Sequence, residues 1–405
     1  MNILQVMGGF VPAQFGGTQK LCHSLSKELV KRGHEVTVYA SDADIGRSRL
    51  KNVRGMRVVD GIKVYYFRNI GHRLLYRYET TFPLGVVLTA RREIANYDVI
   101  HLQVSRSFQN AVVHHYARKH SIPYVLQPHG SIPRVVLGKR GLKWLLKLLF
   151  DVAFGYRILR DASRVIADTE VGVNEAKEAG IRPDRIISLP FPFDTEEFSH
   201  LPPSGRFRDK YGINEKHIVM FLGRIHWIKG LDFLVESFSE LVQLRDDVIL
   251  VIVGPDQDYK TILVELINRL GLSNRVLFTG FLGGEDKLAA LLDADVVVQP
   301  SKYEQAALVP IEAVQCSTPI IVSQDTGAGE DVKRLDAGYL VEYGDKRGMV
   351  ETIRRILDDP SEARAKTQKA RDFIRANLSL TKMVEDYEQI YMECIEENKQ
   401  LRSRK

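Results

Sequence analysis

The stretch IVMFLGRIHWIKGLDFLVESF, residues 218–238, decides the fold because it joins a strand pattern to a helical one. Ile218–Leu222 is a short run that is apolar on both faces, as in a parallel sheet covered on both sides. Gly223 and Gly230 frame a basic loop, and apolar residues then recur at helical spacing at Leu231, Leu234, Val235 and Phe238. The stretch predicts a strand–loop–helix unit of an α/β protein.

The same alternation runs through nearly the whole chain. A first series of predicted strands comprises Ile3–Met7, Glu35–Ala40, Val64–Phe67, Val99–Leu102, Tyr124–Leu126, Val165–Ala167 and Ile186–Leu189. A second series comprises Ile218–Leu222, Val248–Val253, Val276–Thr279, Val296–Gln299, Ile320–Val322 and Tyr339–Val341. Two series with helices between the strands predict two Rossmann-like, doubly wound domains.

The proline-rich segment from Pro190 to Gly205 predicts the boundary between these domains. We therefore expect an N-terminal domain over 1–192 and a C-terminal domain over 193–379. A last helical stripe, at about 380–398, is expected to pack back on the N-terminal domain.

The charge of the chain is unevenly distributed. The formal net charge is +6 and the isoelectric point is near 9.0. The first 190 residues hold 29 Lys+Arg and 15 Asp+Glu, a net +14, which leaves −8 for the remainder. Such a balance is compatible with nucleic acid, a membrane surface or an acidic substrate. With 44% hydrophobic residues, the composition excludes a disordered or collagen-like chain.

Cysteines and targeting signals indicate a cytoplasmic protein. Three scattered cysteines without metal-ligand spacing suit a reducing compartment. The N-terminus lacks the basic region of a signal peptide, and no apolar run is long enough to span a bilayer.

Residues that follow the predicted strands are candidates for ligand binding, because ligands bind beyond the carboxyl ends of parallel strands. After Leu222, the cations Arg224 and Lys229 lie between two glycines, a combination that suits a diphosphate. The alternative is an ordinary basic surface loop. Neither the dinucleotide-binding glycine pattern nor the P-loop pattern occurs in the chain.

Two glutamates, Glu304 and Glu312, follow the predicted strand Val296–Gln299 and flank a predicted loop-to-helix transition. One ligand could contact Glu304 at a sugar and Glu312 at a ribose hydroxyl. The amides of Ala307 and Leu308, at the expected helix start, would then face phosphate. The spacing alone is also compatible with chance, with Glu312 as a solvated helix residue.

The N-terminal half offers two weaker candidates. Gly16-Gly17 opens a helix after the first strand, where backbone amides can approach an oxyanion closely. Among the histidines, His129 stands out because Pro128 and Gly130 frame it just after a predicted strand.

The chain as a whole resembles the retaining glycosyltransferases of the GT-B fold, family 4 (glycosyl transferases group 1). The marks of this resemblance are Gly16-Gly17, Arg32–Val38, His101, Pro128–Gly130, Asp194–Phe198, Gly223–Gly230, Pro300–Glu304 with Glu312-Ala313, and Thr318–Ile321. The resemblance implies two Rossmann-like domains facing a central cleft. It implies transfer of a hexose-type sugar from a nucleotide-diphosphate sugar to an acceptor hydroxyl, with retention.

The resemblance also implies roles for single residues. Arg224 and Lys229 would hold the donor diphosphate, and Gly17 would lie close to it. Glu312 would contact the ribose, while Glu304 and His129 would act at the transferred sugar. No metal or other cofactor is expected.

The chain departs from the family pattern at Glu304-Gln305-Ala306-Ala307, where glycines usually follow the glutamate. We expect phosphate binding to survive this change and the choice of sugar to be affected.

The segment 138–150 predicts a basic amphipathic helix, with Lys139, Lys143 and Lys147 on one face, leucines on another and Trp144 near the boundary. This pattern is typical of a helix that lies on an anionic membrane, although a core-packed helix with a solvated lysine face is the commoner case. A membrane contact would suit a glycan or lipid-linked acceptor and a location at the cytoplasmic membrane face. Two other functions fit the sequence less well: an epimerase acting on a nucleotide sugar, and a basic non-enzymatic module for membrane or nucleic acid.

Overall fold

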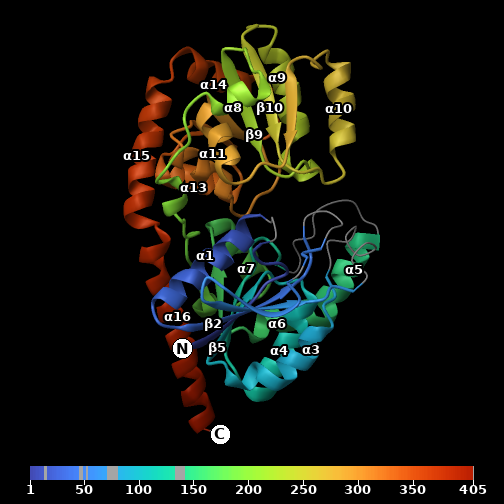
Figure 1. Cartoon of the computed structure of the whole chain (residues 1–405), viewed down its shortest axis with the longest axis vertical. Helices are drawn as coiled ribbons and strands as arrows, with labels where there is room; N and C mark the ends of the chain where they lie inside the picture. The colour runs from blue at the N-terminus through green and yellow to red at the C-terminus, as the bar shows by residue number, and fades with distance from the viewer. Residues whose placement is uncertain (13–15, 45–48, 52, 71–80, 133–141, 405) are drawn as a thin grey trace. The chain divides into compact units, whose positions relative to one another are not determined.

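A computed structural model describes residues 1–12, 16–44, 49–51, 53–70, 81–132 and 142–404. The chain divides into two units: unit 1 consists of Met1–Asp194 and Leu378–Lys405, and unit 2 of Thr195–Asn377. The expected boundary between 192 and 193 lies two residues from the first division. The last part of the chain therefore belongs to the same unit as the first part (Figure 1).

Unit 1 contains an eight-stranded sheet in the order β3-β4-β2-β1-β5-β6-β7-β8. Its strands are β1 (Asn2–Val6), β2 (Glu35–Ser41), β3 (Gly55–Val59), β4 (Ile62–Phe67), β5 (Val99–Gln103), β6 (Tyr124–Gln127), β7 (Arg164–Ala167) and β8 (Ile186–Ser188). Neighbouring strands are parallel except for the β3–β4 pair at the edge.

Helices cover both faces of this sheet. They are α1 (Gly17–Lys31), α3 (Gly85–Glu93), α4 (Phe108–His120), α5 (Leu142–Phe150), α6 (Tyr156–Asp161), α7 (Glu170–Glu178) and α16 (Leu380–Ser403). Figure 1 shows α1 and α16 on one side of the sheet and α3, α4 and α6 on the other. Alternate residues of β5 follow this division. Ile100 and Leu102 join the core formed with α3, α4 and α6, while His101 faces α16.

Helix α16 is an integral part of unit 1, as expected for the last helix. It contacts α1, β5 and β6, and it buries Tyr387 and Tyr391. It also extends further than the expected end near 398. Asn398 donates to the carbonyl of Ser121 over 2.9 Å, and Arg402 donates to the carbonyl of His120 over 2.7 Å. These bonds satisfy carbonyls at the end of α4, which explains why a polar tail stays helical.

Unit 2 contains a six-stranded sheet that is parallel throughout, in the order β11-β10-β9-β12-β13-β14. Its strands are β9 (His217–Leu222), β10 (Val248–Val253), β11 (Val276–Gly280), β12 (Val296–Gln299), β13 (Ile320–Ser323) and β14 (Tyr339–Val341). Its helices are α8 (Arg206–Tyr211), α9 (Leu231–Leu241), α10 (Lys260–Arg269), α11 (Gly284–Asp293), α12 (Leu308–Gln315), α13 (Gly327–Leu335), α14 (Lys346–Asp358) and α15 (Ser361–Asn377).

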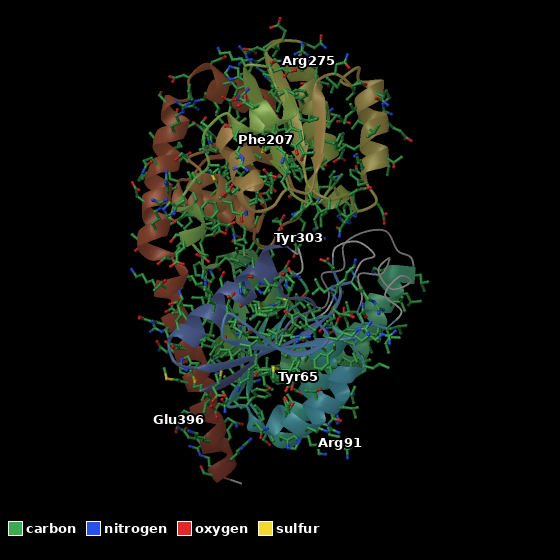
Figure 2. All side chains as sticks on the ribbon, in the orientation of Figure 1. Tyr65, Arg91, Phe207, Arg275, Tyr303 and Glu396 are labelled. Carbon is green, nitrogen blue, oxygen red and sulfur yellow. The ribbon has the colours of Figure 1, made fainter. Side chains whose placement is uncertain are left out.

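Both sheets are Rossmann-like, and this confirms the predicted fold class. Side chains fill the space between each sheet and its helices (Figure 2). The same figure shows Tyr303, in the loop after β12, and Arg275, just before β11, at opposite ends of unit 2. Arg275 marks the side of the sheet where the strands begin, and Tyr303 marks the side where they end. The candidate site lies on the side where the strands end.

One strand, β3, is absent from the predicted series. All its residues except the last are exposed, so it lacks the buried apolar pattern of the other strands. It forms a hairpin with β4 through Asp60 and Gly61, which have φ angles of 50° and 79°. Asp-Gly is a strong sequence signal for a hairpin, because both residues tolerate the positive φ angles that the turn requires. The sequence could therefore have indicated this hairpin.

The chain passes between the units twice, and within unit 1 the two passages are joined. The amide of Phe193 donates to the carbonyl of Leu378, and the amide of Leu380 donates to the carbonyl of Phe193, both over 2.9 Å. The segment that leaves unit 1 is therefore hydrogen bonded to the segment that returns.

The three cysteines, Cys22, Cys316 and Cys394, are unpaired and buried. Burial raises the pKa of each thiol to about 12. Among the helices that the structure describes, none is both long and apolar enough to cross a bilayer.

Candidate active site

The site in unit 2 is built where the loops after β9 and β12 meet. Gly230 has a φ of +66°, and a Cβ atom there would lie 1.9 Å from the carbonyl oxygen of Pro300. Only glycine allows this approach. The amide of Lys302 also donates to the carbonyl of Ile228 over 2.8 Å. The cationic loop after β9 is thereby held against the loop that carries Glu304.

The two cations of the first loop have different surroundings. Arg224 is exposed, and its Nη1 donates to Oε1 of Gln257 over 2.8 Å. Lys229 is largely buried and forms an ion pair with Glu304, whose Oε2 also accepts from Ser301 over 3.4 Å. Two residues with separate predicted roles, Lys229 and Glu304, are thus direct partners.

Helix α12 begins next to this ion pair. Ala307 is its N-cap, with an extended backbone (φ −135°) and no side-chain capping bond, and Leu308 is its first residue. The preceding turn is fixed because the carbonyl of Glu304 accepts from the amide of Gly327 over 2.7 Å. A helix N-terminus without a capping side chain presents amide groups and partial positive charge, which favour an anion.

Glu312 lies in α12 but is not a solvated helix residue. It is only 5% exposed, and its Oε1 pairs with Nζ of Lys287 over 2.9 Å. Nζ of Lys287 is also 3.3 Å from Oε1 of Glu197. Burial lowers the pKa of Lys287, but the charges of Glu312 and Glu197 outweigh burial and raise it overall.

The candidate in unit 1 is a tight turn after β6. His129 and Gly130 have φ angles of 47° and 78°, a conformation that is uncommon for a histidine. Nδ1 of His129 is 3.0 Å from Oδ2 of Asp168, and Nε2 is 2.8 Å from Oε1 of Gln103. The side chain is only 3% exposed. Its two ring nitrogens are therefore engaged by the chain itself.

A buried polar network links this turn to α16. Its further bonds join Gln127 to Asp168 (2.6 Å) and to the Tyr387 hydroxyl (3.2 Å), Gln103 to Gln5 (3.0 Å), and His101 to the Tyr391 hydroxyl (2.7 Å). Burial lowers the pKa of His101 to about 3. The neutral imidazole of His101 is thus a structural hydrogen-bonding group in the core.

Gly17, the other candidate in unit 1, is the first residue of α1, and Gly16 caps the helix without a side-chain bond. A second uncapped helix N-terminus therefore follows β1, at the same edge of the sheet as the His129 turn.

The residues that sequence reasoning missed fall into two classes. Gln103 and Asp168 stand at the carboxyl ends of β5 and β7, so the strand-end rule could have found them. Lys287, Tyr387 and Tyr391 lie within helices, and no local pattern distinguished them from ordinary helix residues.

The sequence contains three Asp-x-Asp pairs, at 42–44, 256–258 and 293–295, and at least one aspartate of each pair accepts hydrogen bonds from backbone amides. Asp293 accepts from the amides of Gly205 and Phe207 over 2.6 and 2.8 Å, and Asp256 accepts from the amide of Lys260 at the start of α10. In the described part of the chain, no cluster of three or more His, Cys, Asp and Glu side chains could hold a metal ion.

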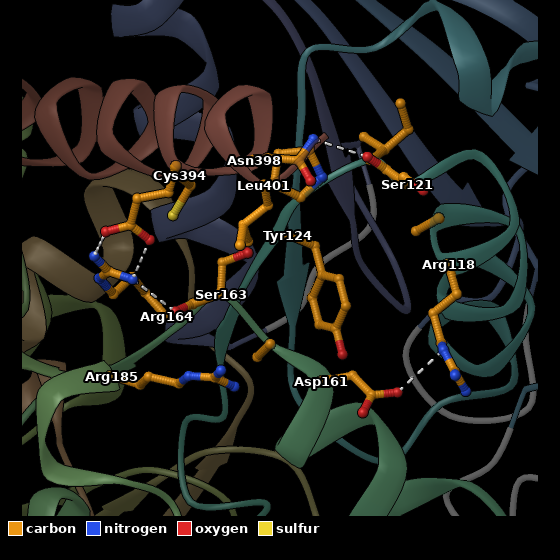
Figure 3. Close-up of a pocket in the computed structure, with 15 residues that line it drawn as sticks. Arg118, Ser121, Tyr124, Asp161, Ser163, Arg164, Arg185, Cys394, Asn398 and Leu401 are labelled. Carbon is orange, nitrogen blue, oxygen red and sulfur yellow. Dashed lines mark hydrogen bonds and ion pairs between the residues drawn. The ribbon is translucent and has the colours of Figure 1, made fainter. Parts of the chain in front are cut away.

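A pocket of about 250 Å³ lies in unit 1, away from these residues. Figure 3 shows residues that line it. Tyr124 and Arg164, the first residues of β6 and β7, line it together with Glu397 of α16. It therefore lies at the amino ends of the strands, opposite the His129 edge. Among the described residues that line it, none is a predicted site residue.

Comparison with known families matches both halves of the chain. Residues 16–192 match the glycosyl transferase 4-like domain, and residues 204–373 match glycosyl transferases group 1. N-acetyl-alpha-D-glucosaminyl L-malate synthase from Bacillus anthracis is 26% identical over 391 residues, which cover 95% of this chain and 96% of that protein.

Solved structures show the same architecture. Sucrose-phosphate synthase from Thermosynechococcus elongatus superposes with a TM-score of 0.78 at 21% identity, over 97% of this chain and 98% of that one. Anabaena Alr3699/HepE, in complex with UDP and glucose, gives a TM-score of 0.76 at 21% identity, over 97% and 100%. At this identity, the likeness supports the fold.

Proposed function

We propose that this protein transfers a hexose-type sugar to an acceptor hydroxyl with retention. The chain is a GT-B glycosyltransferase and belongs to the glycosyl transferases of group 1, which use nucleotide-sugar donors. One observation carries the assignment of the donor site. The Arg224–Lys229 loop is held against the Glu304 loop at the carboxyl ends of β9 and β12, beside the uncapped start of α12.

In this proposal, unit 2 binds the donor. The guanidinium of Arg224 and the ammonium of Lys229 bind the diphosphate, together with the amides of Ala307 and Leu308. Glu312 accepts from ribose hydroxyls, and Glu304 contacts the transferred sugar. Alr3699/HepE was solved with UDP and glucose, which supports a donor of this chemical class.

The Lys229–Glu304 ion pair suggests how donor binding prepares the site. A diphosphate offers Lys229 more negative charge than one carboxylate does. Lys229 then turns to the phosphate, and Glu304 is released toward the hydroxyls of the sugar. The donor thus exchanges one ion pair for two ligand contacts.

The chemical step breaks the bond between the anomeric carbon and a phosphate oxygen, and the electron pair stays on the diphosphate. The acceptor oxygen forms the new bond to the anomeric carbon, and its proton passes to the departing diphosphate. Arg224, Lys229 and the α12 N-terminus stabilise the charge that develops on the leaving group. We propose that these groups take the place of a metal ion.

In this proposal, unit 1 binds the acceptor. His129 acts at the transferred sugar, and Gly17 acts at the donor phosphate. Asp168 and Gln103 fix the imidazole of His129 from both sides, so the turn is rigid before ligands bind. Pre-organisation of this kind lowers the cost of reaching the transition state.

A screen of UDP-, GDP- and ADP-sugars by thermal shift and calorimetry tests the donor assignment. At least one should bind and raise the melting temperature, with no need for added divalent metal and no effect of EDTA. Incubation with that donor alone should give no epimer, which separates transfer from epimerisation. Binding of polyanions without binding of any nucleotide sugar would contradict the proposal.

The proposal about the class of acceptor depends on helix α5. Of the predicted segment 138–150, residues 138–141 lie outside the described residues, and Leu142–Phe150 forms α5. Leu142, Leu145, Leu146 and Leu149 share one helix face and are 44–59% exposed. The expected alternative, a core-packed leucine face, therefore does not hold for these residues.

Exposed apolar residues also follow α5 in the sequence, and a buried ion pair anchors the segment that carries them. Val152 and Phe154, in the π-helical turn Asp151–Gly155, are also exposed. Asp151 is buried, and its Oδ1 pairs with Nε of Arg106 over 2.8 Å. We refer to Leu142, Leu145, Leu146, Leu149, Val152 and Phe154 together as the α5 apolar face.

We propose that the α5 apolar face contacts an anionic membrane and that the acceptor is a lipid-linked or cell-surface glycan. The chain has no carboxylate between Asp98 and Asp151, so the sequence around α5 attracts rather than repels anionic lipid. In this proposal, the reaction takes place at the cytoplasmic membrane face.

Co-sedimentation with vesicles tests this contact. The protein should bind vesicles of phosphatidylcholine with phosphatidylglycerol more strongly than pure phosphatidylcholine. The pair Leu145→Gln and Leu149→Gln should reduce binding roughly tenfold, in keeping with the apolar area withdrawn from the bilayer. Leu244→Gln, at an equally exposed leucine of unit 2, should leave binding unchanged. Equal binding by all three proteins would contradict a role for α5.

A further inference from the structure

Unit 2 buries a three-residue charge cluster that the sequence did not indicate. The ammonium of Lys287 lies 2.9 Å from Glu312 and 3.3 Å from Glu197. Its side chain is 13% exposed, and it passes near the ring of Phe198, with Nζ 6.0 Å from the centroid. The ion pair is therefore largely shielded from water. Opposite charges attract each other more strongly in the protein interior than in water.

The three charges come from separate parts of the unit. Lys287 lies in the first turn of α11, Glu312 in α12, and Glu197 in the short turn Glu196–Phe198 where the chain enters unit 2. Helices α11 and α12 contact each other. The cluster is thus assembled by the fold, and its geometry does not depend on neighbouring residues in the sequence.

Only one of these residues has a role in the proposed reaction. Glu312 is the expected contact for the donor ribose, and it lies one turn beyond the amides of Ala307 and Leu308. A glutamate side chain has several freely rotating bonds, so its carboxylate needs a partner to fix its direction. Lys287 provides that partner, and the carboxylates around it keep it charged at neutral pH.

We propose that Lys287 is a positioning residue that orients the Glu312 carboxylate toward the ribose hydroxyls of the donor. Glu197 holds the ammonium from its other side, so that Lys287 cannot follow Glu312 when the ligand binds. Discrimination between ribose and deoxyribose nucleotides then depends on Lys287, although Lys287 itself does not touch the ligand. The inference rests on the proposed ribose contact of Glu312.

The test compares nucleotides that differ only in a ribose hydroxyl. The probes are the nucleoside diphosphate that binds best among UDP, GDP and ADP, and its 2′-deoxy and 3′-deoxy forms. Calorimetry on the full chain should show that the wild type prefers the ribonucleotide by roughly tenfold, the size expected for one charge-assisted hydrogen bond. In Lys287→Met, this preference should fall toward unity while the deoxy forms bind as before.

A merely structural role would give a different pattern. General damage to unit 2 would weaken ribonucleotide and deoxynucleotide alike and leave their ratio unchanged, and that result would overturn the proposal. If the methionine variant does not fold, Lys287→Gln provides the second test. This variant keeps a hydrogen-bond donor but no charge, and it should also lower the ratio. Lys287→Arg should retain most of the preference. Lys346→Met, which removes an exposed ion pair with Glu236, should retain all of it.

Glu312→Gln separates failure of this inference from failure of the proposed ribose contact. If Glu312→Gln abolishes the preference while Lys287→Met keeps it, Glu312 binds ribose without help from Lys287. If neither variant changes the preference, the ribose contact itself is wrong.

Discussion

At the scale of single residues, Lys229 and Glu304 show why two residues with proposed ligand contacts need not stand out in a structure. Each satisfies the other through an ion pair, so neither stands out as an unpaired charge. Arg224, in contrast, is exposed, and its partner among the residues that the structure describes is the neutral side chain of Gln257. Loss of either cation should therefore affect the chemistry more than the stability.

Arg224→Ala and Lys229→Ala should each lower kcat/KM by about 100-fold or more, since a preorganised donor to a developing negative charge contributes about 2.7–4 kcal/mol. Initial-rate measurements with the identified donor check this. Lys346→Ala, in an exposed ion pair of the same unit, serves as the control and should retain activity. Full activity in either cation variant would refute the diphosphate assignment.

Glu304→Gln removes a charge at the proposed sugar contact and also releases Lys229. We expect kcat to fall by about 10- to 100-fold, the size of one lost hydrogen bond to a charged group, while donor affinity stays equal or rises. Calorimetry and turnover measured on the same preparation separate the two effects. An unchanged kcat would mean that the sugar is contacted elsewhere.

At the scale of elements, α16 completes a hydrogen-bonded network inside unit 1. The Tyr391 hydroxyl bonds to Nδ1 of His101 and to Nε2 of Gln5 (3.3 Å). Tyr391→Phe leaves both groups buried without that partner and should lower the free energy of unfolding by about 1–3 kcal/mol. Urea denaturation measures this change. Tyr116→Phe, at a half-buried tyrosine of α4, should change stability by less than about 0.5 kcal/mol.

The same network predicts a pH dependence. The pKa of His101 is about 3 in the folded protein and about 6.5 in an unfolded chain. Between these values the unfolded state binds the extra proton, so stability is present above about pH 6.5 and is lost as the pH falls toward 3. His101 should contribute a slope of about 1.4 kcal/mol per pH unit over this range. Unfolding of His101→Gln should show a shallower decline than the wild type.

At the scale of the whole molecule, unit 1 is assembled from both ends of the chain. The apolar stripe of α16, including Met383, Val384 and Ile390, is buried within it. A chain ended after Asn377 should therefore lose the calorimetric transition of unit 1 and keep that of unit 2. A chain ended after Ser403 should retain both. Survival of both transitions in the shorter chain would show that α16 is dispensable for folding.

The sequence predicted most of the fold because buried parallel strands and amphipathic helices leave clear periodic patterns. The exposed strand β3 has no such pattern, and only its Asp60-Gly61 turn could have indicated it. Site residues at strand ends, such as Arg224 and Glu304, were within reach of sequence reasoning. Lys287 was not, because the fold brings its partners to it from distant parts of the chain, Glu312 from α12 and Glu197 from the turn Glu196–Phe198.

The hydrogen-bonded passage at Phe193 and Leu378–Leu380 also has a mechanical consequence. Both chain ends belong to unit 1, so a force applied to the termini acts first on the contact between α16 and the rest of that unit. Unit 2 is inserted between these two parts and carries no load until α16 detaches. Pulling on the ends in an optical trap should therefore extend unit 1 first, with unit 2 unravelling only afterwards.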